Sequence, residues 1–423
     1  MSTKAALPSS EPDFPLGERE FVALMAMGVS MHALSIDMML PALGAIAADL
    51  GTQDPNDLQL VIGYYLTGAA FGSLLPGSIA DRFGRRPVLF GTFAAYIILM
   101  LACALMQSFS ALVWARAIQG FVCGGLLVLP AAIIRDRFDG DRMARLQSLT
   151  AVVFLTVPML APALGQFVLD MAGWRWIFGA MAALAALVAT WAWFRLPETL
   201  QPENRSRIHP GDIARSMGSV VTSRESIGYV LGSGLTMSII WAYINSANQL
   251  LYQTYDAGDL FPVVFGAIVA GMVVTNLVNA RIVGIFGARR VSHATLFAFI
   301  ANAMVMVWLA FRPQTTLWEF AACMAVCVGL LGFLGANFTS IAMQPFRRGA
   351  GAASSVQTFI RMLFAAVVGI AVGQAYDGTA RPLALWMLTA SLLVLLLILF
   401  SERGKLFQRR NPPGTPREPP ATP

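Results

Sequence analysis

A short polar turn decides how this chain folds, because it occurs twice. The first copy reads Gly77-Ser78-Ile79-Ala80-Asp81-Arg82-Phe83-Gly84-Arg85-Arg86 and follows the second apolar stretch of the chain. The second copy reads Ala280-Arg281-Ile282-Val283-Gly284-Ile285-Phe286-Gly287-Ala288-Arg289-Arg290 and follows the eighth apolar stretch. Both copies place a Phe-Gly pair before two arginines. We therefore expect a duplicated structure, in which each half of the chain forms one bundle.

Twelve apolar stretches surround these turns and carry most of the chain. The 423 residues are 57% hydrophobic and 12% charged, whereas ordinary soluble domains are roughly 25% charged. Each stretch is long enough, at about 1.5 Å per residue, to cross a hydrocarbon core of roughly 30 Å. The sequence thus predicts an all-α membrane protein with twelve transmembrane helices in two six-helix bundles. The predicted spans are 21–48, 58–80, 88–107, 109–134, 146–170, 174–194, 226–251, 260–280, 291–311, 317–342, 353–376 and 382–401.

The basic residues predict which side of the membrane each loop faces. The chain has 29 Lys and Arg, and most of them lie in the two tails and in the even-numbered loops. The other loops hold Arg175, Arg312 and Arg381, while Arg116 and Arg361 lie inside predicted spans. By the positive-inside rule both termini are cytoplasmic. The net charge of +6 therefore reports topology rather than nucleic-acid binding.

The polar, basic stretch 195–225 divides the twelve spans into six and six. The first span is too long, and too clearly interrupted by Asp37, for a cleaved signal peptide, so we expect it to be retained. The predicted domains are an N-terminal tail (1–20), a first bundle (21–194), a linker (195–225), a second bundle (226–401) and a proline-rich C-terminal tail (402–423).

Four stretches resemble the motifs of one transporter family. Ser35–Leu43 places an aspartate shortly before a Leu-Pro pair, and Gly77–Arg86 fits the pattern Gly-x-x-x-Asp-Arg-x-Gly-Arg-Arg. Arg116–Gly120 fits Arg-x-x-Gln-Gly, while Pro158–Gly165 and Trp174–Phe178 are similar to a fifth-helix antiporter motif and the turn after it. The chain resembles the major facilitator superfamily and, within it, the bicyclomycin-resistance-type drug:proton antiporters with twelve spans. The likeness covers roughly residues 20–400 and implies two bundles that rock about a midplane site.

The chain departs from the family pattern at three positions. Ala161 stands where many antiporters have glycine before the proline, and Gln166 stands where a second glycine is usual. Gly284 replaces the aspartate equivalent to Asp81. Prolines remove helix donors, so we expect a bend in the fifth span. The resemblance implies that this helix seals the antiporter against leak, through Pro158, Pro162 and Gly165.

Asp37 is an acidic residue deep inside a predicted span, where a charge is expensive unless it is neutralised or paired. We predict that it binds and releases the coupling proton, with a static buried pair or a water-facing carboxylate as the alternative. We expect Arg116, Arg361 or both to neighbour it. The resemblance implies that Arg116 takes part in proton transfer. Anchoring to backbone carbonyls is the alternative for both arginines, and Arg361 is also a candidate for binding an anionic substrate.

The first copy of the turn is predicted to form a cytoplasmic gate. Asp81 can cap a facing helix N-terminus, and the arginines can pair with an acid such as Asp136. Breaking and making these contacts would open and close the gate. The alternative is that the arginines only set topology, which we favour for Arg82. The predicted gating residues are Gly77, Asp81, Gly84, Arg85, Arg86 and Asp136.

Polar and aromatic residues inside the spans are candidates for lining a substrate cavity. Trp241, Asn245, Asn248 and Gln249 recur at helical spacing along one side of the seventh span. Hydrogen bonding between helices is the alternative role for any one of them. The full set of candidates is Tyr64, Tyr65, Gln119, Trp241, Tyr243, Asn245, Asn248, Gln249, Asn337 and Arg361.

The sequence offers no metal site and no catalytic motif. Cys323 and Cys327 lie one helical turn apart, but they have no nearby His or acidic partner, so we expect them to be packing residues. The three histidines offer no metal site, and neither a nucleophile triad nor a phosphate loop is present. His32 lies about 140° around the helix from Asp37, so we do not expect the two to be partners. We expect no enzyme activity and no cofactor, with the proton as the coupling ion.

Together with these patterns, the resemblance implies a secondary active exporter of small amphipathic compounds, driven by proton antiport in the bacterial inner membrane. We expect a monomer in the lipid bilayer, with no nucleic-acid partner. The nearest alternative is a proton-coupled symporter, or an exporter of one specific metabolite, including an anionic one. A membrane sensor or enzyme is a distant alternative, because the short outer loops carry no cluster of catalytic groups.

Overall fold

The computed structural model describes residues 15–52, 55–138, 140–200, 222–344 and 350–408, together with residues 203, 211 and 218. All regular secondary structure in these residues is helical. Ten helical segments are long and apolar enough to cross a membrane, and a pair bent by 43° makes an eleventh span. The helix that contains the apolar segment Thr156–Ala172 completes the set of twelve.

The first half of the chain supplies six spans. The first span is broken into three pieces, and the second is the bent pair. In chain order the elements are α1 (Glu18–Asp37), η1 (Leu40–Ala42), α2 (Leu43–Leu50), η2 (Pro55–Asp57), α3 (Leu58–Gly72), α4 (Pro76–Phe83), α5 (Arg85–Ala104), α6 (Phe109–Arg137), α7 (Gly140–Ala172) and α8 (Trp174–Arg195).

The second half supplies the other six spans. Its first span ends in the π-helical segment η4, and the next begins with the short 3₁₀ helix η5. The elements are α10 (Arg224–Asn248), η4 (Gln249–Thr254), η5 (Gly258–Leu260), α11 (Phe261–Phe286), α12 (Ala288–Phe311), α13 (Leu317–Met343), α14 (Ala350–Gln374) and α15 (Arg381–Ser401).

The predicted spans agree with the observed helices to within a few residues at most ends. Several helices continue beyond the apolar stretch, and α11 runs to Phe286 although its predicted span ends at residue 280. Backbone hydrogen bonding does not stop where side chains become polar, because the ends of a membrane helix lie among the lipid headgroups. The sequence analysis did not predict the break after α1, the bend between α3 and α4, or the π-helical end of α10.

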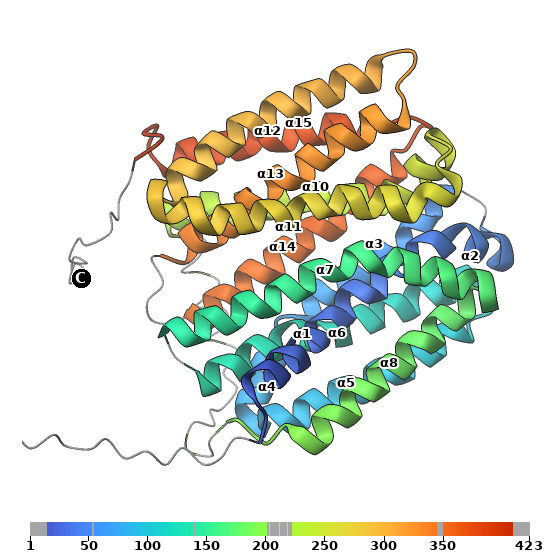
Figure 1. Cartoon of the computed structure of the whole chain (residues 1–423), viewed down its shortest axis with the longest axis vertical. Helices are drawn as coiled ribbons and strands as arrows, with labels where there is room; N and C mark the ends of the chain where they lie inside the picture. Colours follow the sequence, from blue (N-terminus) through green and yellow to red (C-terminus); the bar gives the residue numbers. More distant parts are fainter. Residues whose placement is uncertain are drawn as a thin grey trace, which may run out of the picture.

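The two halves lie side by side, with α1–α8 in one and α10–α15 in the other (Figure 1). They meet where α3 packs on α14 and α7 packs on α11. The outer helices α5, α8, α12 and α15 expose large apolar side chains, as lipid-facing helices do. Examples are Ile98, Leu187, Trp308 and Leu396, each more than 60% exposed.

Small residues bring α3 and α6 into backbone contact. A Cβ added to Gly120 would lie 1.9 Å from the Tyr65 carbonyl oxygen, and one added to Gly72 would lie 1.9 Å from that of Phe121. Neither position can hold a larger residue without a helix shift. Gly120 ends the Arg-x-x-Gln-Gly motif, so its role is close helix approach. The motif thereby holds Arg116, one turn away, against α3.

The predicted tails 1–20 and 402–423 and the linker 195–225 lie largely outside the described residues. The domain bounds therefore remain predictions. At the C-terminal end the described chain continues past α15 to residue 408, and this short segment packs on the start of α12 through hydrogen bonds to His293 and Arg290.

Candidate functional site

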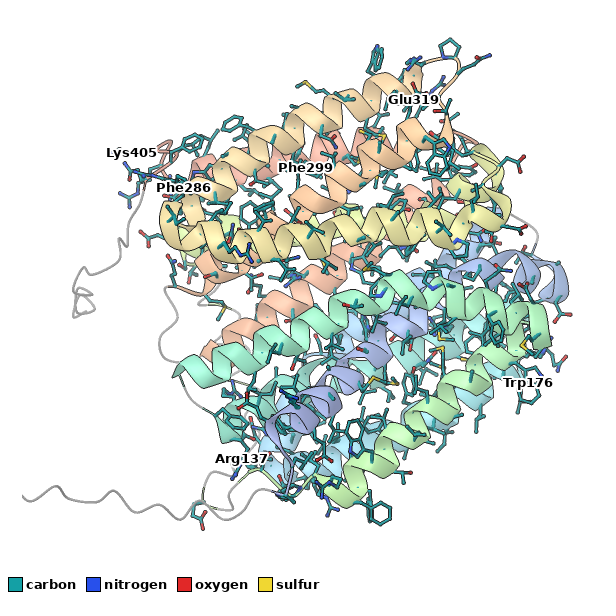
Figure 2. All side chains as sticks on the ribbon, in the orientation of Figure 1. Arg137, Trp176, Phe286, Phe299, Glu319 and Lys405 are labelled. Atoms are coloured by element: carbon teal, nitrogen blue, oxygen red, sulfur yellow. The ribbon has the colours of Figure 1, made fainter. Side chains whose placement is uncertain are left out.

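A cavity of about 500 Å³ lies between the two halves. Figure 2 marks the two ends of the bundle: Arg137 and Lys405 lie at one end, and Trp176 and Glu319 lie at the other. The first is called the termini end, because α1 begins and α15 ends there, and the second is the far end. The cavity is lined by α1, α4, α6, α7, α10 and α14, among other segments, and its charged residues include Asp81, Arg85, Arg135 and Arg361.

Hydrogen bonds join the two halves at the far end. Asn56 donates to the carbonyl oxygens of Gln374 (3.2 Å) and Tyr376 (3.3 Å), and its own carbonyl accepts from Gln374 Nε2 at 2.8 Å. Gln249 Nε2 donates to Asn56 Oδ1 at 2.8 Å, and Gln59 Nε2 donates to Gln249 Oε1. The halves are therefore closed at the far end, while the cavity separates them toward the termini end.

Asp37 is the last residue of α1 and is only 3% exposed. Its carboxyl oxygen Oδ1 is buried and has no hydrogen-bond partner among the described residues. The helix ends here because Pro41, four residues later, has no N–H to donate to the Asp37 carbonyl. A helix C-terminus carries partial negative charge, which further disfavours an anion. A charged carboxylate at this position is therefore costly.

The antiporter-motif helix α7 packs directly on this break. A Cβ added to Gly165 would lie 1.9 Å from the Met38 carbonyl oxygen, so no other residue fits there without movement. Ala161, one turn earlier, is fully buried. The helix runs through Pro158 and Pro162 without interruption. The fifth-helix motif thus places its glycine against the residue that follows Asp37.

Arg116 is completely buried in α6, among neutral partners. Its guanidinium donates from Nη2 to the Ser35 carbonyl oxygen (2.8 Å) and from Nη1 to Gln119 Oε1 (2.5 Å), and it lies 4.3 Å from the Tyr65 ring centroid. We expected Arg116 to neighbour Asp37, but no ion pair joins these two residues in the structure. Asp37 lies two residues beyond Ser35, about 200° around the helix, so its side chain leaves α1 on another side.

His32 is a cavity residue that the sequence analysis missed. It is 1% exposed, lies at the cavity wall, and its Nδ1 is 3.1 Å from the Tyr65 hydroxyl. Its ring lies 6.2 Å from that of Trp241 on α10, edge to face. Its Nε2 has no hydrogen-bond partner in the described part of the chain. The sequence did carry a signal, since any ionisable residue in mid-span is a candidate functional group, but His32 was considered only as a partner for Asp37.

Arg361 lines the cavity from α14. Its contacts are long: Nη1 lies 3.5 Å from Thr339 Oγ1, and Nη2 lies 3.6 Å from the sulfur of Met237. No carboxylate of the described residues pairs with it, so it is not a neighbour of Asp37 either. Its charge faces the cavity without a counter-ion.

Three of the residues predicted to form a gate make ion pairs with one another at the termini end. Arg85 Nη2 lies 2.6 Å from Asp81 Oδ1, and Arg85 Nε lies 2.6 Å from Asp136 Oδ2, which is the pairing expected with Asp136. Arg85 Nη1 also donates to the Gly77 carbonyl oxygen at 3.4 Å. Asp81 lines the cavity with 39% of its side chain exposed, whereas Arg85 is nearly buried. These contacts all lie within the first half.

Glu198, which the sequence analysis missed, caps the helix that follows this turn. Its carboxylate accepts from the backbone N–H groups of Arg85 (2.9 Å) and Arg86 (3.1 Å), at the N-terminus of α5. Asp81 does not fill this capping role here, because it pairs with Arg85 instead. Gly84 has a φ of +102°, and a Cβ added to it would lie 2.5 Å from a Glu198 oxygen. Arg86 anchors the turn by donating to the Trp193 carbonyl oxygen at 2.8 Å.

Of the predicted cavity residues, Trp241 and Arg361 line the cavity and the others lie elsewhere. Tyr65 and Gln119 support Arg116, and Gln249 belongs to the far-end contacts. Asn248 also bridges the halves, by donating to the Leu40 carbonyl oxygen at 2.9 Å.

Four further candidates make contacts within one half. Tyr64 packs edge to face on Trp114, and Tyr243 stacks on Phe265. Asn245 donates to a backbone carbonyl one turn earlier, and Asn337 exchanges two amide hydrogen bonds with α11. These residues act as hydrogen-bonding and packing groups between or within helices, which was the alternative role.

Comparison with known proteins agrees with this architecture. The profile described as Major Facilitator Superfamily matches residues 25–370. A bicyclomycin resistance protein homolog of Haemophilus influenzae is 26% identical and covers 87% of this chain and 92% of its own length. The uncharacterized MFS-type transporter YdgK of Bacillus subtilis is 30% identical over the same shares, 87% and 92%. The multidrug resistance protein MdtL of Escherichia coli is 28% identical, with shares of 89% and 94%.

Two solved structures share the fold. The D-xylose-proton symporter superposes with a TM-score of 0.71 at 14% identity, over 91% of this chain and 99% of its own. The human organic anion transporter MFSD10 (TETRAN) superposes with a TM-score of 0.63 at 20% identity, over 91% of this chain and 100% of its own. At such low identity these likenesses concern the fold alone.

Proposed function

Because the chain belongs to the Major Facilitator Superfamily, we propose that it exports small amphipathic compounds, drugs among them, across the bacterial inner membrane in exchange for protons. Its relatives include a bicyclomycin resistance protein homolog and a multidrug resistance protein, at 26% and 28% identity. A cavity between two bundles, wide toward one end and closed at the other, supports an alternating-access cycle.

The observation that carries the proposal is the buried carboxyl of Asp37 at the break after α1. Within the described part of the chain it has no counter-ion and its Oδ1 has no hydrogen bond, so a proton is the simplest way to remove its charge. The break touches both halves: α7 packs on Met38, and Asn248 of α10 donates to the Leu40 carbonyl. Opening the far end would break the Asn248 contact and admit water near Asp37, where the proton is exchanged.

Arg116 and the gate residues support this cycle by positioning the Asp37 carboxyl and by closing the termini end. Arg116 fixes the α1 backbone at Ser35, two residues before Asp37, and so controls where the carboxyl lies. When the termini end closes, Asp81 is released from Arg85 and meets the second half. Arg116 thus acts in proton exchange, whereas Asp81 and Arg85 act in closure of the termini end.

We place the termini end in the cytoplasm. The gate arginines and the basic residues Arg19, Arg403 and Lys405 lie at this end, and positively charged segments stay on the cytoplasmic side. The structure then represents a state open to the cytoplasm, in which a compound enters from inside the cell.

The test is protonophore-sensitive export from efflux-deficient cells that express the chain. We expect accumulation of a fluorescent amphipathic dye and of a neutral antibiotic to fall, and to rise again with a protonophore. Asp37→Asn should abolish this export at normal membrane abundance, while Asp259→Asn, an exposed acid at the far end, should retain it. Normal export by Asp37→Asn would remove Asp37 as the proton site.

A symporter or a carrier of one specific anion is the second candidate, because Arg361 faces the cavity and no described carboxylate pairs with it. The direction of substrate transport under a pH gradient distinguishes an antiporter from a symporter. In inside-out vesicles, an inward-acid pH gradient drives uptake by an antiporter, whereas a symporter loses substrate under the same gradient.

A further inference from the structure

We propose that the cavity binds the acidic group of an amphipathic organic anion, such as an aromatic carboxylate, through Arg361, Trp241 and His32. This inference rests on the proposed function, because it names the substrate class of the same transporter. All three side chains line the cavity, and an anion would supply the acceptors that Trp241 Nε1 and His32 Nε2 lack among the described residues.

Arg361 is the charged donor of the set. Among the residues that the structure describes, its guanidinium has two long contacts, at 3.5 Å to a threonine hydroxyl and at 3.6 Å to the Met237 sulfur. A guanidinium has five N–H donors in a planar fork that matches a carboxylate. Most of this hydrogen-bonding capacity is therefore available to a ligand in the cavity.

Trp241 and His32 supply two neutral donors. Trp241 is 7% exposed and His32 is 1% exposed, and both side chains reach the cavity wall. Trp241 Nε1 and His32 Nε2 have no hydrogen-bond partner among the residues that the structure describes. When the Tyr65 hydroxyl donates to His32 Nδ1 across 3.1 Å, the remaining ring hydrogen lies on Nε2. Buried donors without partners are costly, so a bound acceptor would stabilise both.

The three donors lie along one continuous wall. Met237, which contacts Arg361, is one helical turn before Trp241 on α10, so both side chains lie on the same face. The Trp241 ring in turn lies 6.2 Å from the His32 ring. The wall therefore runs from α14 through α10 to α1, and it joins the second half of the protein to the first.

The charges around the cavity favour an anion over a cation. Among the lining residues Arg85, Arg135 and Arg361 are basic, and Asp81 is acidic. Asp81 is already paired with Arg85 at 2.6 Å, whereas Arg135 and Arg361 have no carboxylate partner in the described chain. The membrane-embedded Asp37 is not part of the lining. A cationic compound would find no unpaired acid among the described residues that line this cavity.

The remaining lining is apolar and fits an aromatic body. Val29, Phe154, Met237 and Met362 line the same space as the three donors. A cavity of about 500 Å³ lies within the usual range for sites that bind small molecules, roughly 300–1,000 Å³. An aromatic ring carrying one carboxylate would place its ring on these side chains and its charge at Arg361.

The test measures binding of three probes with one ring system, on the purified full chain in lipid nanodiscs. The probes are 2-naphthoate, 2-naphthamide and 2-naphthylmethylammonium, and isothermal titration calorimetry gives their dissociation constants. We expect naphthoate to bind about tenfold or more tightly than the other two, because hydrogen bonds to charged groups exceed neutral ones. Arg361→Gln should weaken naphthoate about tenfold or more and leave the amide unchanged.

Two further variants separate charge from packing. Arg361→Lys keeps the charge and should retain part of the preference for naphthoate. Trp241→Phe keeps the ring but removes the N–H donor, and it should weaken naphthoate about threefold to tenfold. Arg312→Gln removes an exposed arginine near the far end and serves as the control, with unchanged binding. Thermal melting of each variant verifies that it is folded.

The proposal is overturned if the ammonium probe binds as tightly as naphthoate, if naphthoate does not bind, or if Arg361→Gln binds naphthoate normally. This assay uses no proton gradient, so it is independent of the antiport claim. Selective naphthoate binding without proton-coupled export would overturn the proposed antiport and leave the anion site standing. Proton-coupled export of a neutral antibiotic without naphthoate binding would overturn the anion site and leave the proposed antiport standing.

Discussion

The turn before α5 and the turn before α12 begin alike, yet they have different partners. Gly84 and Gly287 both have positive φ, +102° and +85°, and both lead directly into the next helix. In each turn an arginine then reaches the C-terminal end of the helix after that one, α6 in the first half and α13 in the second. Arg85, directly after Gly84, pairs with Asp136 near the end of α6, and Arg289, two residues after Gly287, donates to Gln344 at the end of α13. The shared geometry is what a duplication leaves behind.

The difference lies in which acid holds each arginine. In the first half Asp81, on the turn itself, pairs with Arg85 and stays 39% exposed at the cavity. In the second half Gly284 stands at the equivalent position. Arg289 pairs instead with Glu402, just after α15, at 2.8 Å, and both side chains are nearly buried.

Each half also has an acid shortly after its last helix, and these two acids differ in role. Glu198, after α8, accepts from backbone N–H groups at the N-terminus of α5. Glu402, after α15, accepts from Arg289 and from the Tyr229 hydroxyl at 2.8 Å. In the first half Glu198 therefore stabilises the turn by capping α5, and Asp81 remains at the cavity. The second half uses its acid to fix the arginine. We infer that the first turn moves during transport and the second is a static anchor.

The largest expected effect is a loss of stability on breaking the buried pair in the second half. Arg289→Gln leaves Glu402 buried without its counter-ion, and removing one partner of a buried pair costs about 3–5 kcal/mol. Steric-trapping measurements of the free energy of unfolding in bicelles would report this change. Arg312→Gln, which removes the arginine of an exposed pair with Glu319, should cost about 0–1 kcal/mol. Equal losses in the two variants would contradict a special anchoring role for Arg289.

The next effect is on turnover rather than on stability. Asp81→Ala removes an exposed partner of Arg85, worth about 0–1 kcal/mol in the folded state. If Asp81 must change partners at every cycle, transport per folded molecule should fall about tenfold, equivalent to about 1.4 kcal/mol in the barrier. Initial rates of dye export, normalised to membrane abundance, measure this. Asp259→Ala, at the exposed far end, is the matched control. Unchanged turnover in Asp81→Ala would show that the two turns are equally static.

The sequence predicted the spans and the duplicated turn because both depend on local composition. Long apolar stretches identify membrane helices without knowledge of their neighbours. The pairing of Arg85 with Asp136 was also accessible, because both lie at the same end of adjacent helices. The break after Asp37 follows from Pro41, whose missing N–H ends α1, although it was not predicted.

The sequence did not show which side chains face the cavity. Helices that are apolar all round carry little directional pattern, so periodicity does not tell a cavity face from a face packed on another helix. Asn248 and Gln249 were expected in the cavity, but they hold the two halves together instead. His32 was passed over, although it lies against Trp241 at the cavity wall. These positions depend on how two bundles meet, which is a property of the whole fold.

The smallest expected effect concerns the contrast between the two acids Glu198 and Glu402. Glu198→Gln keeps a side-chain oxygen that can accept from the N–H groups of Arg85 and Arg86 but removes its charge. A charge at a helix N-terminus contributes about 0.3–1 kcal/mol and is screened by salt. We therefore expect a loss in the free energy of unfolding of this size at low ionic strength, shrinking as salt is added. The same measurement on Glu402→Gln should show a larger loss that salt hardly changes, because buried pairs are screened much less than exposed charges. Equal and equally salt-sensitive losses would mean that both acids do the same work, and that the two halves differ only in the aspartate of the first turn.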